Sequence, residues 1–180
     1  MQLVAYGAQD IYLTGNPQIT FFKVVYRRHT NFSMEAIEQT WDGSTLTAGR
    51  CSSTISRNGD LIYRMYIQLE ISANTYNVAN PGAHFIDTVE LEIGGQLIDR
   101  HSGQWLETWA ELTELNPAGR VCDTNNTGTL FQRMSGMGGQ ITAKTFANDG
   151  ARCFVPLQFW FNRNPGLALP LIALQYHEVK

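Results

Sequence analysis

The sequence has little charge and few cysteines, and both shortages narrow the class of protein. Charged residues make up 16% of the 180 residues, against about 25% in an average domain. A surface with so few charges must be covered by neutral polar side chains or by partner subunits, which is typical of assembled proteins. The three cysteines, Cys51, Cys122 and Cys153, form no C-x-x-C pair, so we predict neither a disulfide scaffold nor a zinc module.

Long apolar runs and positive charge are also lacking. The longest apolar stretch, Gly166 to Leu174, is interrupted by Pro170 and is far shorter than a membrane-spanning helix, which needs about 20 residues. The first ten residues have neither the basic start nor the apolar core of a secretory signal. The net charge of −3 argues against binding of nucleic acid through bulk electrostatics, which requires a basic surface.

Short alternating runs separated by Gly, Asn, Asp and Pro indicate antiparallel strands. The clearest run is Tyr63 to Ile71, in which the odd-numbered positions are all apolar. Asp87 to Ile93 repeats this pattern with Glu90 and Glu92 on its polar face, and Gly94-Gly95 then supplies the positive φ that a tight hairpin turn requires. Further candidate strands are Ile19 to Tyr26, Met34 to Trp41, Cys51 to Ser56, Gln96 to Asp99, Cys153 to Phe161 and Leu167 to Val179.

A helical spacing interrupts the strand pattern between Ser102 and Leu115. Ser102 is suited to cap the start, and Asn116-Pro117 to end the helix. The apolar side is formed by Trp105, Leu106, Trp109, Ala110 and Leu112, and the opposite side by Glu107, Glu111 and Glu114. We interpret Trp105 and Trp109, like Trp41, as packing residues rather than a ligand site.

Together these patterns predict an all-β fold with one short helix in a connection. The arrangement that fits this chain length is an antiparallel β-sandwich of the jelly-roll type. Gly119 to Gly150 is rich in Gly, Asn and Thr and predicts an extended loop, with a short helix or strand near Phe131. A loop of that length is unusual unless it has a function, so we expect it to face outward or to contact a neighbouring subunit.

The sequence contains no pattern that indicates a catalytic or metal site. No two of the four histidines have metal-ligand spacing, and an H-x-H pair of the kind found in cupin-type metalloenzymes is missing. Glu90 and Glu92 are paired carboxylates, which can perform acid–base chemistry, but a regular polar strand face is better explained by solvent or a subunit contact. We therefore predict that the protein is not an enzyme and uses no metal or cofactor.

Two local features are candidates for contacts and modification. Arg27, Arg28 and His29 form the basic cluster of the sequence, which we interpret as an intersubunit or inner-surface contact because so few charges bind nucleic acid weakly. Asn31 and Asn125 each begin an N-x-S/T sequon and are candidate glycosylation sites if the chain enters a secretory route.

Four blocks, in order along the chain, resemble the major capsid proteins of large nucleocytoplasmic DNA viruses, above all those of algal viruses. These blocks are GAQDIYLTGNPQITFFKVVYRRHTNF (Gly7 to Phe32), SRNGDLI (Ser56 to Ile62), DTVELEIGGQLIDRH (Asp87 to His101) and NPGLALPLIALQYHEVK (Asn164 to Lys180). The region from Gly119 to Gly150 lacks the resemblance, as expected for a variable loop.

The resemblance implies a double jelly-roll protein. Residues 1–17 would then be a segment at the capsomer base, and residues 18–180 the first jelly roll, ending before its closing strand. It also implies that three copies form a capsomer of pseudo-hexagonal outline, and that capsomers and minor capsid proteins build an icosahedral shell. The protein would be found in the virion after assembly in the host cytoplasm, with outer loops that carry glycans and with no specific nucleic-acid partner.

Two other functions remain open from the sequence. A carbohydrate-binding jelly-roll module would expose aromatic rings on one face. A cupin-like metalloenzyme would bind stoichiometric metal, which the missing H-x-H pair already disfavours.

Overall fold

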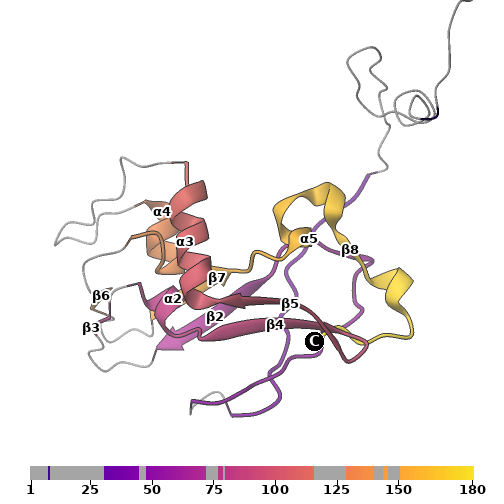
Figure 1. The fold of residues 1–180 in the computed structure, drawn as a ribbon, viewed down its shortest axis with the longest axis horizontal. Coiled ribbons are helices and arrows are strands. Elements are labelled where there is room, and N and C mark those ends of the chain that lie inside the picture. The colour runs from indigo at the N-terminus through magenta and orange to yellow at the C-terminus, as the bar shows by residue number, and fades with distance from the viewer. Residues whose placement is uncertain are drawn as a thin grey trace, which may run out of the picture. The chain divides into compact units, whose positions relative to one another are not determined.

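The structure is a computed structural model. It describes residues 8, 31–44, 48–71, 77–78, 80–115, 129–139, 144–145 and 151–180. The chain divides into two units, Met1–Glu38 and Gln39–Lys180. In the first unit, residues 31–38 have no regular secondary structure and are exposed. The strands and helices named below belong to the second unit (Figure 1).

The described strands associate as four antiparallel pairs. The pairs are β1 (Leu61–Ile62) with β8 (Leu169–Pro170), β2 (Tyr66–Ile71) with β7 (Ala151–Pro156), β3 (Asn77–Val78) with β6 (Lys144–Thr145), and β4 (Thr88–Ile93) with β5 (Gln96–Ser102). Antiparallel pairing is therefore confirmed, whereas the packing of two sheets into a sandwich stays a prediction.

The β4–β5 hairpin follows directly from its sequence. Gly94 and Gly95 have φ values of 62° and 80°, which a turn of two residues requires and other residues rarely adopt. Leu91 is 2% exposed and faces the core, while Glu90 and Glu92 point to the opposite face, as predicted. Lys180 continues the pairing on the other edge of β4, because its backbone N–H and carbonyl both bond to Glu92.

Four α-helices lie within the described residues. These are α2 (Pro81–His84), α3 (Gly103–Thr113), α4 (Leu130–Ser135) and α5 (Trp160–Arg163), and two 3₁₀ helices, η2 (Pro165–Leu167) and η3 (Leu171–Leu174), follow α5. The Ser102 hydroxyl accepts a hydrogen bond from the Trp105 N–H at 3.1 Å, so the predicted cap of α3 is confirmed. The prediction of a single helix is wrong, since short helices leave too little apolar periodicity to be recognised.

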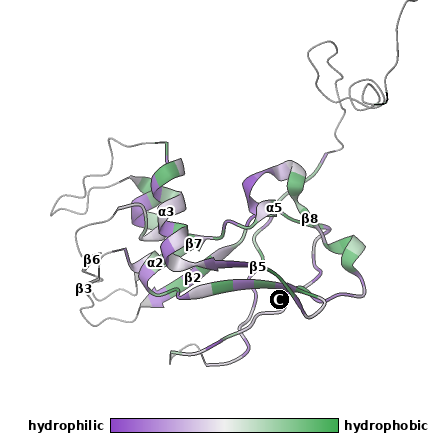
Figure 2. Cartoon of the chain, in the orientation of Figure 1, coloured by the Kyte–Doolittle hydropathy of each residue, from purple (hydrophilic) through white to green (hydrophobic). Residues whose placement is uncertain are grey.

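The core of the second unit is made by apolar side chains from both strands and helices. Figure 2 shows these hydrophobic residues distributed along the strands and in η3. The buried members are Ile86, Leu91, Leu106, Ala110, Met137, Val155, Leu157, Phe159, Phe161, Leu169, Leu171 and Val179. The alternation predicted from Cys153 to Phe161 is confirmed as burial, although only Ala151–Pro156 is strand.

Three predicted strands are not formed. Residues 34–41 have no strand structure, although their side chains alternate as those of a strand do. Cys51 to Ser56 contributes a single bridge, Ser52 to Asp42. Leu167 to Val179 divides into β8 and η3 because Pro170 has no N–H to donate to a ladder.

Two buried polar residues were not predicted from the sequence. Gln132 lies in the segment Gly119 to Gly150, which was expected to face outward or to contact a neighbouring subunit, but it is 2% exposed on α4 and packs inward. Of the short helix or strand expected near Phe131, the structure forms the helix. Asn162 directly follows the alternating run Cys153 to Phe161, which gave no sign that it is buried; its Nδ2 donates to the Tyr63 carbonyl at 2.9 Å. Ile19 to Tyr26, and residues 1–17 apart from residue 8, lie outside the described residues.

Candidate contact surface

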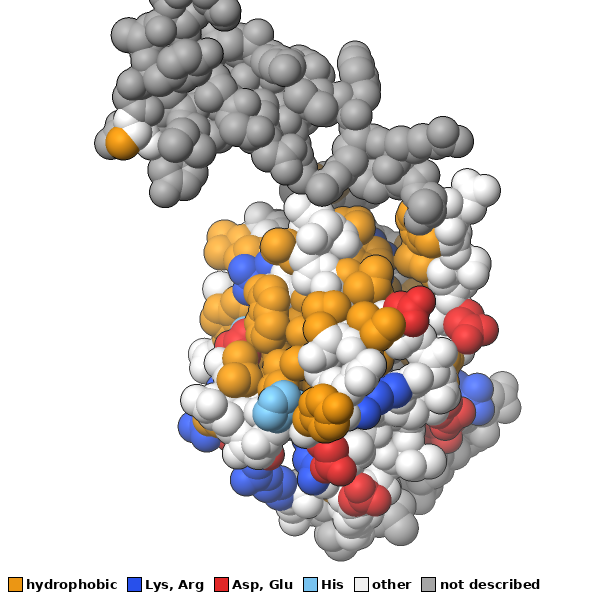
Figure 3. All heavy atoms as spheres, turned by 90° about the vertical axis from the view of Figure 1, so that its right-hand side faces the viewer, with side chains coloured by type: hydrophobic (Ala, Val, Ile, Leu, Met, Phe, Trp, Pro, Cys, Tyr) orange, Lys and Arg blue, Asp and Glu red, His pale blue; other side chains and the backbone are white. Residues whose placement is uncertain are grey.

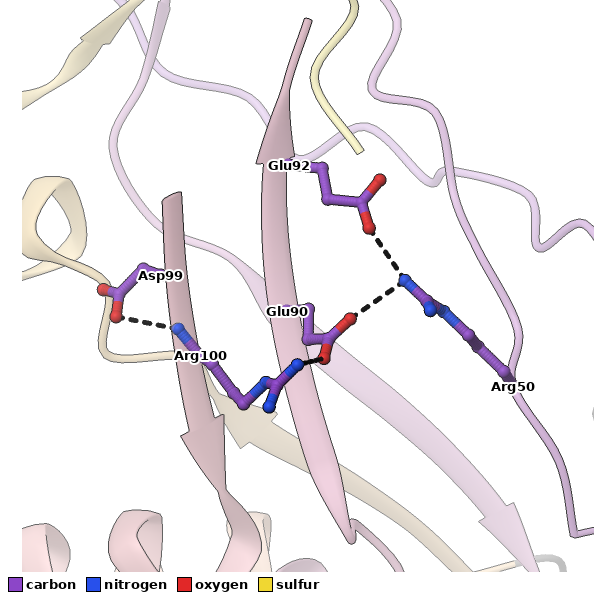
Figure 4. A network of polar contacts seen from close by, with 5 residues as sticks. All are labelled: Arg50, Glu90, Glu92, Asp99 and Arg100. Carbon is purple, nitrogen blue, oxygen red and sulfur yellow. Dashed lines mark hydrogen bonds and ion pairs between the residues drawn. The ribbon is translucent and has the colours of Figure 1, made fainter. Parts of the chain in front are cut away.

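A polar network covers the outer face of the β4–β5 hairpin (Figure 4). Arg50 Nη2 lies 2.9 Å from Glu90 Oε2 and 2.7 Å from Glu92 Oε1. Arg100 Nη2 lies 2.6 Å from the other oxygen of Glu90. The two guanidinium groups balance the two carboxylates, so the face is polar but electrically nearly neutral.

This network is better suited to contact than to catalysis. The Arg50 side chain is 75% exposed, and exposed ion pairs contribute only about 0–1 kcal/mol each to stability. General acid–base chemistry requires a carboxylate in a concave, partly desolvated site. Glu90 and Glu92 instead lie on a strand face and are already paired with arginine.

An aromatic column joins β5 to α3 and α5. Neighbouring rings are nearly parallel, with interplanar angles of 18–23°, and their centroids are 4.2–5.9 Å apart. In order, the column consists of Phe161, Phe159, His101, Trp105 and Trp109. Arg163 ends the column, with its guanidinium carbon 4.4 Å from the Trp109 ring centroid. The packing role predicted for Trp105 and Trp109 agrees with this arrangement.

His101 is the titratable member of the column. It is 8% exposed, its Nε2 lies 3.4 Å from Asp99 Oδ2, and its Nδ1 has no hydrogen-bond partner among the described residues. Burial lowers the pKa of His101, with Asp99 acting in the opposite direction and the positive charge of Arg163 in the same direction. The ring is therefore neutral at neutral pH, which is the form that its apolar neighbours accommodate.

Glu107 connects α3 to the glycine-rich segment after α4. Its carboxylate accepts hydrogen bonds from the Gly138 N–H at 3.1 Å and the Gly139 N–H at 2.8 Å. On the other side, Gln132 Nε2 donates to the Gly138 carbonyl at 2.7 Å. Sequence reasoning placed Glu107 on the solvent side of α3 and missed this role, because the partner glycines are about 30 residues further along the chain.

An apolar face lies at the end of the second unit that carries α5, β8 and η3. Figure 3 looks onto this end and shows hydrophobic side chains gathered there. The large hydrophobic residues exposed on these elements and their connections are Trp160, Leu167, Ile172 and Tyr176, at 36%, 52%, 62% and 94% exposure. We refer to these four residues as the apolar face. Large exposed apolar patches commonly mark surfaces that bind another protein.

The predicted site residues are only partly covered by the structure. Arg27, Arg28, His29 and Asn125 lie outside the described residues, so their contact and glycosylation roles stay predictions. Asn31 is described and exposed, which leaves its sequon accessible. Trp41, expected to pack, is 45% exposed, because the strand that would have carried it is not formed.

Neither a metal site nor a membrane helix occurs in the part of the chain that the structure describes. No group of three or more His, Cys, Asp or Glu side chains there is arranged to hold a metal ion. No described helix has the length and apolar character needed to cross a bilayer.

Comparison with known protein families identifies the family of this chain. A family model described as "Major capsid protein N-terminus" matches residues 20–180. The chain belongs to this major capsid protein family. The resemblance inferred from the four sequence blocks is thereby confirmed.

The relatives of this capsid chain come from several large DNA viruses. It is 54% identical over 186 residues to the major capsid protein of Pyramimonas orientalis virus, covering all of this chain and 44% of the relative. It is 48% identical over 181 residues to that of Paramecium bursaria Chlorella virus 1, covering 99% of this chain and 38% of the relative. The chain thus spans about two fifths of these relatives.

A solved capsid structure has a similar fold. The VP54 protein of PBCV-1, in a crystal structure fitted into a reconstruction of the virophage Sputnik, matches with a TM-score of 0.64 and 44% identity. The match covers 89% of this chain and 36% of that one. VP54 and the relatives are structural proteins of virus capsids.

Proposed function

We propose that this chain is the shell-forming part of a major capsid protein that assembles into trimeric, pseudo-hexagonal capsomers of an icosahedral virus shell. The observation that carries the proposal is the family match over residues 20–180, since the matched relatives are named capsid proteins. In this proposal the paired strands belong to a jelly-roll sandwich, the first of two, formed from residues 18–180.

The described surface supports self-association. A face with four exposed apolar side chains is costly in water, and covering it removes apolar area at roughly 25 cal/mol per Å². The polar, charge-balanced face at Arg50, Glu90 and Arg100 suits the rim of an interface, where polar groups stay partly hydrated. Such surfaces are usually covered by identical subunits that associate with closed symmetry.

The partners follow from the same proposal. The chain would contact two copies of itself in the capsomer, then neighbouring capsomers and minor capsid proteins. It would be found in the virion after assembly in the host cytoplasm, with glycans on outer loops and without specific nucleic-acid contacts. Its activity is assembly rather than catalysis.

The carbohydrate-binding alternative gains no support. Trp105 stacks between His101 and Trp109, and Arg163 lies over Trp109, so these two rings are used in packing. The exposed rings of Trp160 and Tyr176 belong to the apolar face, which the proposal assigns to subunit contact. The relatives reported above are capsid proteins rather than lectins.

The test is the assembly state of the purified protein. We expect sedimentation velocity to show a trimer, and Ile172→Glu to shift it towards monomer because the charge would be placed on the apolar face. Leu112→Glu is the matched control, since Leu112 is 78% exposed on α3, away from that face. A folded wild-type protein that stays monomeric at every concentration would overturn the proposal.

A further inference from the structure

The turn that precedes β1 contains Asn58, Gly59 and Asp60. Asn58-Gly59 is the one Asn-Gly pair in the sequence. All three residues are exposed and form a bend rather than a strand or helix. An asparagine followed by glycine can react with its own backbone, because glycine has no side chain to block the approach of its amide nitrogen.

The structure leaves both reacting groups available. Within the described part of the chain, neither the Asn58 amide nor the Gly59 N–H makes a hydrogen bond. The space beside Gly59 is open, since an added Cβ would meet only the Leu61 carbonyl oxygen, at 3.9 Å. Water can therefore reach the site, and no bond has to break before the reaction begins.

We propose that Asn58 is a site of spontaneous deamidation that changes the turn into β1. After loss of its proton to solvent base, the Gly59 amide nitrogen attacks the Asn58 side-chain carbonyl carbon and forms a five-membered succinimide. The bond from that carbon to the side-chain nitrogen breaks, and ammonia leaves with a proton from solvent. Water then opens the ring at either carbonyl, which gives aspartate or isoaspartate.

Isoaspartate matters here because the turn is anchored on both sides. On one side, Arg57 Nη2 donates to the carbonyls of Leu174 at 3.0 Å and His177 at 3.2 Å. On the other, the Asp60 carbonyl accepts from the Leu171 N–H at 2.9 Å. Isoaspartate adds one carbon to the backbone between these anchors, so both cannot keep their present geometry. The reaction should therefore loosen η3, which carries part of the apolar face.

Other candidate residues in the chain serve as internal comparisons. Asn164 is followed by Pro165, which has no N–H to attack, and its Oδ1 already accepts from the Gly166 N–H at 2.9 Å. Asn31 is exposed, but the bulky Phe32 follows it. Asp42-Gly43 could form the same ring, but Asp42 is held by two backbone hydrogen bonds to Ser52.

The experiment is to age the folded full chain in mildly alkaline and mildly acidic buffer, then denature and digest it with trypsin. Cleavage after Arg57 and Arg64 releases residues 58–64, whose mass reports the exchange of amide for carboxyl. Digestion in heavy-oxygen water separates reaction during ageing from reaction during digestion. We expect this peptide to convert faster than those containing Asn31 or Asn164, and faster in alkaline buffer. Equal rates for Asn58 and Asn31 would overturn the proposal.

Two variants separate the chemistry from its structural effect. Gly59→Ala should fold normally, since its methyl group has room, and should slow conversion several-fold. Asn58→Asp adds the negative charge of the product without the extra backbone carbon, so it should have the same Tm as fresh wild type. Aged wild-type protein that is rich in isoaspartate should have a lower Tm. Aged protein as stable as Asn58→Asp would refute the loosening of η3.

Discussion

Replacing Glu107 by alanine should destabilise the second unit by removing the acceptor that holds the glycine-rich segment to α3. The Gly138 and Gly139 N–H groups would both lose their partner. An unsatisfied buried donor costs about 1–3 kcal/mol, and partial burial here places each donor in the lower half of that range, so we expect the two together to lower the free energy of unfolding by about 2–4 kcal/mol. For a chain of this size that corresponds to a decrease in Tm of roughly 5–15 °C.

The assay is urea unfolding together with amide hydrogen exchange. Gln104→Ala, an exposed change on the same helix, is the control for helix propensity, and Glu107→Gln, which keeps one acceptor oxygen, should be intermediate. Exchange at Gly138 and Gly139 should accelerate more than exchange in the β4–β5 hairpin. If Glu107→Ala unfolds at the same urea concentration as Gln104→Ala, the carboxylate does not hold this segment and the reasoning fails.

Three other perturbations test separate parts of the structure. Because the pKa of His101 in the fold is below its ordinary value of 6.5, the unfolded chain binds that proton more readily. The stabilisation that comes from neutral His101 should therefore be fully present above about pH 6.5 and decrease at lower pH. In urea unfolding, His101→Phe should make the free energy of unfolding depend less on pH in this range. An unchanged pH dependence in the variant would contradict the prediction. Gly82→Ala should lower Tm strongly, since the methyl group would overlap the Ser135 carbonyl oxygen, and an unchanged melting curve would show that α2 can move aside. Arg50→Ala should lower the free energy of unfolding by less than about 1 kcal/mol, and added salt should remove the difference between variant and wild type. A difference that does not depend on salt would show that Arg50 stabilises the fold by more than an exposed ion pair with Glu90.

The elements that the sequence predicts well are those defined by neighbouring residues. The hairpin needs only the alternation of β4 and the two glycines after it, and α3 needs only the Ser102 cap and its apolar spacing. Both are confirmed because their information lies within about a dozen residues. The four family blocks work for a similar reason, since each is a continuous string.

The elements that it predicts poorly depend on partners far along the chain. Met34 to Trp41 alternates as a strand does but forms no strand, because strand formation depends on the backbone of a distant segment as well as on local alternation. Asn162 is buried because the fold brings it beside the Tyr63 carbonyl, 99 residues earlier in the chain, which no local pattern can indicate. Pro81 at the first turn of α2 is a local signal for the start of a helix, but a helix of four residues has no apolar periodicity to accompany it.

The candidate surface was predicted less completely than the fold. Glu90 and Glu92 were correctly placed on a polar strand face, but Arg50 could not be recognised as their partner because about 40 residues separate it from them. The apolar face was also missed, because Ile172 and Tyr176 were assigned to a strand, in which alternate apolar side chains are expected to face the core.

The pairing of β2 with β7 has a consequence for how the chain acquires its structure. Tyr66 and Pro156 are neighbours in the fold but about 90 residues apart in sequence, so this pair forms only after a long loop has closed. The β4–β5 hairpin closes over a two-residue turn and is available as a nucleus as soon as it leaves the ribosome. Until β7 has been synthesised, Ile67 and Leu69 on β2 lack their cover, and a chain made in large amounts would carry many such uncovered strands at once. The yield of correctly folded protein should therefore depend on the rate of synthesis and on chaperones.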